Sequence, residues 1–286
     1  MATLRAIPLD VISLIVEQHL FDDASTLQAC SLVARSFLAP SRKGIFHTIH
    51  LDHVLKAQEQ CQKLYRVFSD NFAISTYVRE IYVLDYDTDT LGCTPRTPYL
   101  SSRVKHWASG EETLHAILQM LPNLRLLSFK FSEDAWSPNE WRSLSAELKL
   151  ALGRVLTLPT LTVCKLEGVD NIPSEWFDAY RSLKELSLTA VSVLPDRMSR
   201  FSSSSIRSRN AQLERLELAD ICDDIIFEAM RASVDISQLR EVSVRSDNPN
   251  VIWEATKDAT GTLEMLTWDY YGDDGWYSLW SILSSS

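Results

Sequence analysis

The sequence predicts an α/β fold in which a short N-terminal helical module precedes a long array of strand and helix units. Two observations carry this prediction. Apolar residues recur with helical spacing between residues 7 and 38, and beyond residue 70 a short apolar string typical of buried strands returns along the chain. A chain of 286 residues is long enough to bury a substantial core.

Composition and charge argue against several classes of function. The 28 Lys and Arg against 38 Asp and Glu give a net charge of -10, which opposes binding to nucleic acid or to an anionic membrane. Only 8 glycines occur and no GxxxxGK or GxGxxG string is present, which disfavours a nucleotide site. The 5 cysteines form no CxxC pair, so we expect a reducing location, cytoplasmic or nuclear. The N-terminal apolar stretch is too short for a membrane span.

Residues 7–20 are predicted to form the first helix. Pro8 suits the first helical position, where its missing amide proton is not needed, and Asp10 suits the first turn. The apolar residues of this helix fall into two sets. One set is Leu9, Ile12, Val16 and Leu20, and the other is Val11, Leu14 and Ile15. The helix therefore has two apolar faces to bury.

A second helix is predicted to begin at the capping-box pair Ser25 and Gln28 and to end before Pro40. Its last part is equally apolar. A unit of about 40 residues cannot bury this much apolar surface within itself. The surplus requires a partner, which is either the remainder of this chain or a second protein.

This stretch resembles the F-box, a short helical module of substrate receptors. The matching residues are Ile7-Pro8-Leu9-Asp10, Ile12, Ile15, Leu20, Leu27, Cys30-Ser31-Leu32-Val33, Arg35 and Phe37. Ile7 stands where the family has Leu, and Phe46 where it has a late Trp. The resemblance implies an F-box-like module over residues 5–45 that docks on a Skp-type adaptor and so joins a cullin-RING ubiquitin ligase. The adaptor-binding residues that it implies are Ile7, Pro8, Val11, Ile12, Ile15, Leu27, Cys30, Val33 and Phe37.

Residues 46–286 contain a repeated string of the form apolar-x-x-apolar-x-apolar, whose last two positions alternate as in a strand with one buried face. The copies beyond residue 70 are Val78-Ile81-Val83, Leu124-Leu127-Phe129, Leu161-Cys164-Leu166, Leu183-Leu186-Leu188, Leu213-Leu216-Leu218, Leu239-Val242-Val244 and Leu263-Leu266-Trp268, and Phe46-Ile49-Leu51 is a candidate for an earlier copy. Helical spacing between them predicts helices over Glu111–Leu121, Asn139–Leu156 and Asp223–Val234.

Strands that alternate with helices predict a parallel sheet with the helices on one side. The repeats resemble degenerate leucine-rich repeats, and this implies an irregular solenoid over residues 46–286, with helices on the convex side, a concave sheet surface and a C-terminal cap. A non-repetitive, irregular α/β domain is the structural alternative.

Residues between the buried strand positions are candidates for contact with a target protein, because successive strand residues point to opposite faces. Those selected are Arg215, Glu217, Glu241 and Arg245 from the repeats, and Asp269, Tyr270, Tyr271 and Trp276 from the C-terminal end. The C-terminal group combines aromatic area with negative charge, which favours a basic target. The same segment could instead be a cap that shields the last repeat.

The expected function is target recognition without catalysis. We expect no catalytic residue, metal or cofactor, because His47, His50 and His53 would not converge and Asp85, Asp87 and Asp89 lack the remaining ligands of a calcium loop. The Ser- and Arg-rich residues 197–209 are expected to form an exposed insertion. The alternatives are a repeat scaffold without a ubiquitin-ligase link and a small-molecule enzyme site in the concavity.

Overall fold

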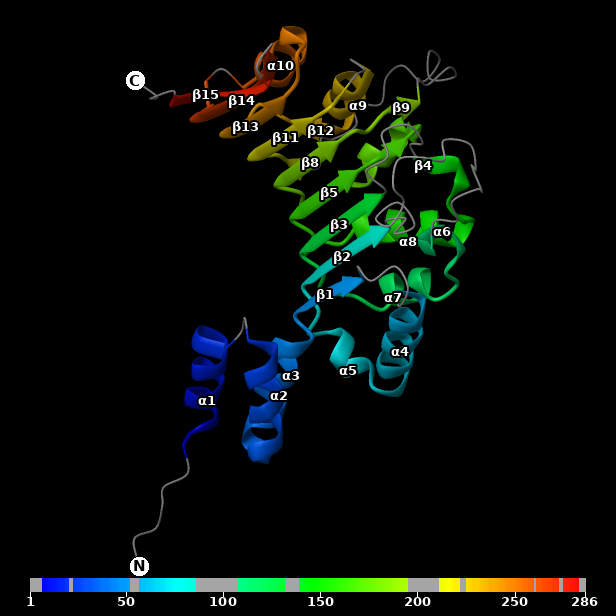
Figure 1. Ribbon diagram of the computed structural model, residues 1–286, viewed down its shortest axis with the longest axis vertical. Coiled ribbons are helices and arrows are strands. Elements are labelled where there is room, and N and C mark those ends of the chain that lie inside the picture. Colours follow the sequence, from blue (N-terminus) through cyan, green and yellow to red (C-terminus); the bar gives the residue numbers. More distant parts are fainter. Residues whose placement is uncertain are drawn as a thin grey trace, which may run out of the picture.

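The protein has an α/β fold built on one large sheet, with helices on one of its faces (Figure 1). The computed structural model describes residues 7–20, 23–51, 57–85, 107–131, 139–194, 211–221, 225–259, 261–272 and 275–282. Helices from the N-terminal part of the chain lie beyond the first strand, at one end of the sheet (Figure 1).

The N-terminal part is helical, as the apolar periodicity predicts. Its elements are α1 (Leu9–Ile15), the π-helical turn η1 (Val16–Leu20), α2 (Ala24–Val33) and α3 (Arg35–Ile45). They enclose a small core of Ile12, Val16 and Leu27, against which Leu20, Phe37 and Ile45 pack. A Cβ at Gly44 would lie 2.8 Å from Leu27 Cδ1, so the glycine permits close packing of α3 on α2.

Two predicted helix boundaries in this part are wrong. The residue that caps α2 is Asp23, whose Oδ1 accepts the N–H groups of Ser25 and Thr26, each at 3.0 Å. Hydrogen bonds from Thr26 and Ser25 lower the pKa of Asp23 to about 2. The chain breaks at Ala34, whose backbone is extended, and α3 then continues through the buried Pro40. Pro40 has no backbone N–H to donate, so α3 lacks one helical hydrogen bond at this position. The helix nevertheless runs from Arg35 to Ile45.

The last two positions of all eight apolar strings lie on strands of one sheet. Eight of its strands are parallel and follow one another in sequence order. A ninth strand pairs antiparallel with the eighth and forms one edge of the sheet. The strands, in spatial order, are β1 (Thr48–Leu51), β2 (Glu80–Asp85), β3 (Leu126–Phe131), β5 (Val163–Glu167), β8 (Glu185–Thr189), β11 (Arg215–Ala219), β13 (Glu241–Arg245), β14 (Met265–Gly272) and β15 (Gly275–Ile282).

The parallel strands share one register, so equivalent repeat positions line up across the sheet. This alignment produces two continuous apolar rows. The first row is Ile49, Ile81, Leu127, Cys164, Leu186, Leu216, Val242 and Leu266, and the second is Leu51, Val83, Phe129, Leu166, Leu188, Leu218, Val244 and Trp268. Most of these side chains belong to the main core.

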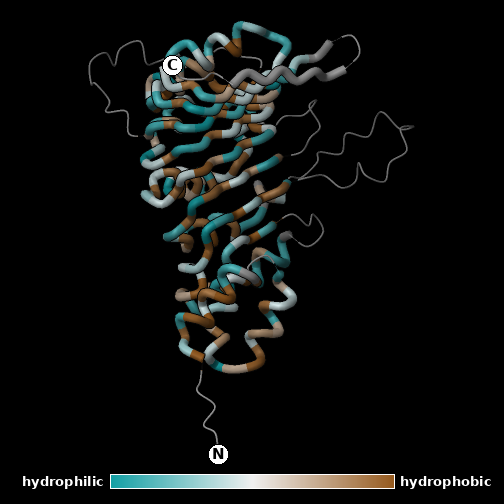
Figure 2. The backbone as a smooth tube through the Cα atoms, turned by 90° about the vertical axis from the view of Figure 1, so that its left-hand side faces the viewer, coloured by the Kyte–Doolittle hydropathy of each residue, from teal (hydrophilic) through white to brown (hydrophobic). Residues whose placement is uncertain are grey.

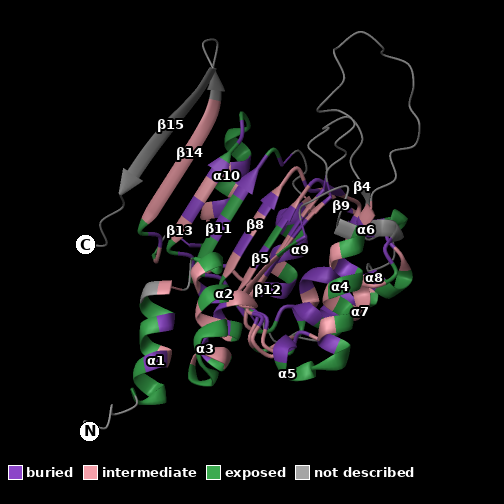
Figure 3. Cartoon of the chain, turned by 60° about the horizontal axis from the view of Figure 1, so that its bottom comes forward, coloured by how far each residue is buried: buried purple, intermediate pink, exposed green. Residues whose placement is uncertain are grey.

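Helices pack on the face of the sheet that carries these rows (Figures 1 and 3). They are α4 (Ala57–Asp70), α5 (Phe72–Ser75), α6 (Trp107–Gly110), α7 (Leu114–Gln119), α8 (Ala146–Leu156), α9 (Ile225–Ser233), α10 (Pro249–Thr256) and the 3₁₀ turns η3 (Trp141–Ser143) and η4 (Ser174–Ala179). The three predicted helices are thus found, each shorter than expected. The predicted helix over Asn139–Leu156 begins late because a short strand and η3 occupy its first residues.

Short two-stranded ladders accompany the main sheet. They are β4 (Asn139–Glu140) with β6 (Val169–Asp170), β7 (Ile172–Pro173) with β9 (Val193–Leu194), and β10 (Ala211–Gln212) with β12 (Val234–Asp235), all parallel. The concave surface expected from the repeats is not found, because the sheet is not curled.

Three neighbouring strands of the sheet are each followed by a residue with a positive φ angle. These residues are Gly168 after β5 (69°), Ala190 after β8 (48°) and Asp220 after β11 (54°). Each donates its backbone N–H to the last residue of the next strand, for example Ala190 to the carbonyl of Ala219 at 2.8 Å. The same left-handed turn therefore recurs at the same place in successive units.

Replacing Leu186 by Ala tests the apolar rows. Leu186 is buried in the middle of the first row, so its truncation should lower the free energy of unfolding by about 2–5 kcal/mol in urea denaturation. The matched control is Leu150→Ala on α8, where the side chain is 73% exposed and the change should stay below about 0.5 kcal/mol. Equally small losses in both variants would contradict this description of the core.

Replacing Ala190 by Gly tests the recurrent turn. A left-handed backbone strains any residue with a Cβ, so this change should raise the free energy of unfolding by about 0.5–1 kcal/mol. Ala232→Gly, at an exposed position of α9, should instead lower it by about 1 kcal/mol. A similar loss in the two variants would show that Ala190 is not in this conformation.

Candidate functional site

Exposed apolar side chains are concentrated on the N-terminal helices. We name as the N-terminal apolar surface the residues Ile7, Leu9, Val11, Leu14, Ile15, Leu32 and Val33. Leu32 is 87% exposed and Val33 is 74% exposed. Hydrophobic colour recurs along the backbone at this end of the molecule in Figure 2.

The rest of the described chain shows no comparable concentration. Its exposed large apolar residues are Tyr65, Phe72, Leu150 and Trp253, which lie on four different helices. Single exposed apolar residues are normal in soluble proteins, whereas several of them on one small helical unit indicate an interaction surface. The N-terminal apolar surface is therefore the strongest candidate for a docking site in the described residues.

The helical period of α1 explains how this surface arises. Ile12 and Val16 are four residues apart and point into the small core, so Val11 and Ile15, which are also four apart, lie on another side of the helix. An ion pair between Glu17 of η1 and Lys43 of α3 joins this helix to the rest of the N-terminal unit. The unit uses one apolar face of α1 for its own core and leaves the other uncovered.

The structure divides the predicted adaptor-binding residues into two groups. Ile7, Pro8, Val11, Ile15 and Val33 are exposed, as an adaptor contact requires. Ile12 and Leu27 are only 2% and 1% exposed, so their assignment to the adaptor surface is wrong, and Cys30 and Phe37 are half-buried. The apolar pattern missed this division because both faces of α1 are apolar, and spacing alone does not tell which face packs inward.

The sequence pattern does not single out three residues of this surface. Leu9 has the helical spacing of the buried Ile12 and Val16, and only exposure distinguishes Leu14 and Leu32 from other apolar residues. Leu32 and Val33 are adjacent at the end of α2, where the helix stops and the chain turns away. A run of apolar residues directly before a helix break was the available signal.

The second candidate surface is the open face of the sheet, which we define as the face opposite to the helices. Its residues alternate with the buried rows, and the selected Arg215, Glu217 and Glu241 lie on it. Arg215 stands between two carboxylates: its Nε donates to Glu241 Oε2 at 2.6 Å, and its Nη1 lies 3.5 Å from Glu185 Oε2. The hydrogen bond to Glu241 raises the pKa of Arg215.

Opposite charges also meet elsewhere on the open face. Lys130 Nζ lies 2.7 Å from Glu167 Oε1, and the exposed Arg245 is directly opposite Asp269 in the register of β13 and β14. Such surface pairs contribute at most about 1 kcal/mol each. The open face therefore presents paired charges of both signs rather than a strongly acidic or basic patch.

The C-terminal group of target-binding candidates is not one cluster. Asp269 lies on the open face, but Tyr270 lies on the opposite one, where its ring centroid is 5.5 Å from that of Trp268. The strand alternation explains this correction, because neighbouring residues of β14 point to opposite sides. Tyr271 and Trp276 are opposite each other in the β14–β15 register, and their side chains lie outside the described residues.

Aromatic and titratable groups on β1 and β2 form a smaller cluster of the open face. The rings of His50 and Tyr82 stack with a centroid distance of 4.7 Å, and Tyr82 donates its hydroxyl to Glu80 Oε2 at 3.4 Å. Burial and the Glu80 carboxylate raise the pKa of Tyr82, whereas burial lowers the pKa of His47. His53, Asp87, Asp89 and residues 197–209 lie outside the described residues.

Some chemistry-bearing side chains in the described residues are buried or take part in structural contacts. Asp85 accepts the N–H of Trp107 at 3.0 Å, and burial raises the pKa of the Cys61 and Cys164 thiols to about 12, which keeps them protonated. No group of three or more His, Cys, Asp or Glu residues within the described ranges is placed to hold a metal ion. The described helices include none that is long and apolar enough to cross a membrane.

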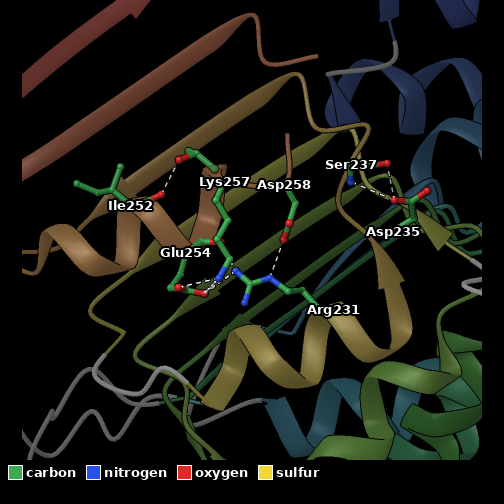
Figure 4. A network of polar contacts seen from close by, with 8 residues as sticks. Arg231, Asp235, Ser237, Ile252, Glu254, Lys257 and Asp258 are labelled. Atoms are coloured by element: carbon green, nitrogen blue, oxygen red, sulfur yellow. Dashed lines mark hydrogen bonds and ion pairs between the residues drawn. The ribbon is translucent and has the colours of Figure 1, made fainter. Parts of the chain in front are cut away.

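A polar network on the helix side joins α9 to α10 and to the residues that follow α10 (Figure 4). Arg231 Nε lies 2.8 Å from Asp258 Oδ2, and its Nη2 lies 2.6 Å from Glu254 Oε2. Lys257 Nζ also lies 2.7 Å from Glu254 Oε2, and Lys257 and Arg231 both lower the pKa of Glu254. These charges hold two neighbouring helices together.

Neither a protein-family model nor a curated protein matches this chain.

Proposed function

We propose that this protein is the substrate-recognition subunit of an SCF-type (Skp, cullin, F-box) E3 ubiquitin ligase. The single observation that carries the proposal is the N-terminal apolar surface, which lies on the same helices as the F-box-like pattern. Removing apolar surface from water contributes about 25 cal/mol per Å², so an adaptor that covers these residues gains a large favourable term. The protein itself performs no chemistry in this proposal.

In this proposal, only the exposed residues of the motif contact the Skp-type adaptor. Ile12 and Leu27 build the core that holds the helices in place. The contact itself would use the exposed members of the motif, and Leu9, Leu14 and Leu32 extend it. Exposed apolar residues on a helix are what a helix-in-groove contact uses.

We also propose that the sheet and its helices are a degenerate leucine-rich-repeat array. Three features support this: the strands follow in sequence order with one register, a left-handed residue recurs after them, and short second strands recur beside them. Polar residues at equivalent pre-strand positions also bind the preceding unit. Asn123 Nδ2 donates to the Thr76 carbonyl, and the hydroxyls of Thr160 and Thr262 donate to the carbonyls of Leu124 and Leu239.

The target protein would bind the open face of the sheet. This face carries exposed polar side chains on a rigid scaffold, which favours specific recognition through a few residues. Glu217 and Arg245 are exposed there and lie on neighbouring strands. A repeat scaffold of the same architecture that binds partners without a ubiquitin-ligase link is the second candidate, and adaptor binding separates the two.

A double substitution on the N-terminal apolar surface tests the proposal. Ile15→Glu with Val33→Glu places two charges on exposed positions and should weaken binding to a purified Skp-type adaptor by about 100-fold or more, measured by isothermal titration calorimetry. Thermal unfolding should be nearly unchanged, because neither side chain is part of the small core.

The matched control is Leu150→Glu with Trp253→Glu, which adds the same charge at exposed apolar positions of α8 and α10 and should leave adaptor affinity unchanged. An adaptor affinity that is the same for wild type and the N-terminal variant would contradict the proposed surface. A wild-type protein that binds no adaptor would favour the scaffold function.

A further inference from the structure

The residues directly before the parallel strands form a row along the end of the sheet at which these strands begin (Figure 1). Each residue after the first donates its backbone N–H to the carbonyl of the row residue before it, for example Arg125 to Arg79 at 2.7 Å. Neighbouring members of the row are therefore about 5 Å apart along the backbone. We name as the entry row the residues His47, Arg79, Arg125, Thr162, Lys184, Glu214, Arg240 and Glu264.

The later part of the entry row alternates basic and acidic residues that pair with each other. Lys184 Nζ lies 2.7 Å from Glu214 Oε1, and Arg240 Nη1 lies 3.9 Å from Glu264 Oε1. The first part of the row has no such alternation, because it consists of a histidine followed by two arginines. Like charges therefore adjoin at the end of the row that lies nearest to the N-terminal helices.

The two arginines of this first part lack an acidic partner. Arg79 Nη1 donates to the carbonyls of Thr76 and Val78, at 2.7 and 3.2 Å, which holds its guanidinium in place. Arg125 is exposed. Among the described residues neither arginine forms an ion pair with a carboxylate. Burial and the charge of Arg125 lower the pKa of Arg79, as expected for two cations close together.

The surroundings of His47 have the same excess of positive charge. The charged groups that act on His47 are Glu80, Arg79, Arg125 and Lys43. Among these four, only Glu80 is negative, and its Oε2 accepts the hydroxyls of Thr48 and Tyr82 at 3.3 and 3.4 Å. Lys43 pairs with Glu17, so the unneutralised charge is that of the two arginines.

We propose that Arg79 and Arg125 bind an acidic segment of the target protein through its carboxylates. This inference rests on the proposed target recognition and names the chemistry of the target. A carboxylate between the two guanidinium groups replaces their repulsion by attraction, and arginine can bind a carboxylate with two parallel hydrogen bonds. The net charge of -10 opposes such binding only weakly, because at about 0.15 M ionic strength exposed charges more than about 8 Å away are largely screened.

The form of the entry row favours a protein segment over a small anion. A single exposed ion pair contributes little affinity, whereas several carboxylates joined in one chain bind together at a high effective concentration. The row from His47 to Arg125 covers two strand spacings, about 10 Å, which is about the length of three extended residues. It lies directly before strand residues of the open face, where the remainder of the target would bind.

Fluorescence anisotropy with two fluorescein-labelled peptides tests this proposal. At about 0.15 M ionic strength the full chain should bind a peptide of six consecutive glutamates at least about tenfold more tightly than its six-glutamine counterpart. Arg125→Glu reverses a charge at an exposed position and should weaken binding of the glutamate peptide by at least about tenfold. Arg125→Gln, which only removes the charge, should weaken it by at least about threefold.

The matched control is Arg240→Glu, which makes the same change of charge at an equivalent, exposed position in the paired part of the entry row. It should change the affinity for the glutamate peptide by less than about twofold. Thermal unfolding of the variants at Arg125 should stay close to that of wild type, because this side chain is exposed.

Three results would overturn the proposal. Wild-type protein that binds the two peptides alike, or binds neither, has no site for carboxylates. An equal loss in Arg125→Glu and Arg240→Glu would show that net charge alone sets the affinity. Displacement of the glutamate peptide by about 1 mM inorganic phosphate would assign the arginines to a small anion. The Ile15→Glu, Val33→Glu variant should bind the glutamate peptide like wild type, so failure of this proposal and failure of the proposed function are distinguishable.

Discussion

The structure depends on one register shared by all the parallel strands. Each strand is short and has only a few apolar side chains to bury, so it has no stable core of its own. The common register lines these side chains up into two rows, and the helices cover both rows at once. The rows are buried only if every strand keeps this register, because a shift of one residue in any strand would turn its apolar side chains to the open face.

This constraint separates the surfaces that remain for function. The helix side of the sheet is used for the core, and the charges on that side, such as Arg231, hold helices together. The open face is left polar and internally charge-paired. The N-terminal unit has too few residues to bury all its apolar side chains, so it keeps several of them exposed, among them Ile15 and Val33. The proposed adaptor and target contacts therefore lie on separate parts of the molecule.

The strands could be predicted from the sequence because each repeats the same two buried positions. Other features could not. The helix that passes through Pro40 depends on the break at Ala34, and the burial of Ile12 depends on which face of α1 packs against α2 and α3. Sheet curvature depends on how successive units stack, which no local pattern records. Tyr270 was assigned with its neighbours as an aromatic cluster, although strand alternation separates it from Asp269. β14 carries the last repeat, and β15 lies beyond it, where only the residues of the intervening turn indicate a hairpin.

Hydrogen–deuterium exchange of the full chain with and without a purified Skp-type adaptor is the most direct test of the central claim. The account predicts that the adaptor slows exchange in peptides from α1 and from the end of α2, where the N-terminal apolar surface lies, and leaves the strands of the sheet unchanged. Unchanged exchange in these helices at a saturating adaptor concentration, or protection confined to the open face of the sheet, would contradict it.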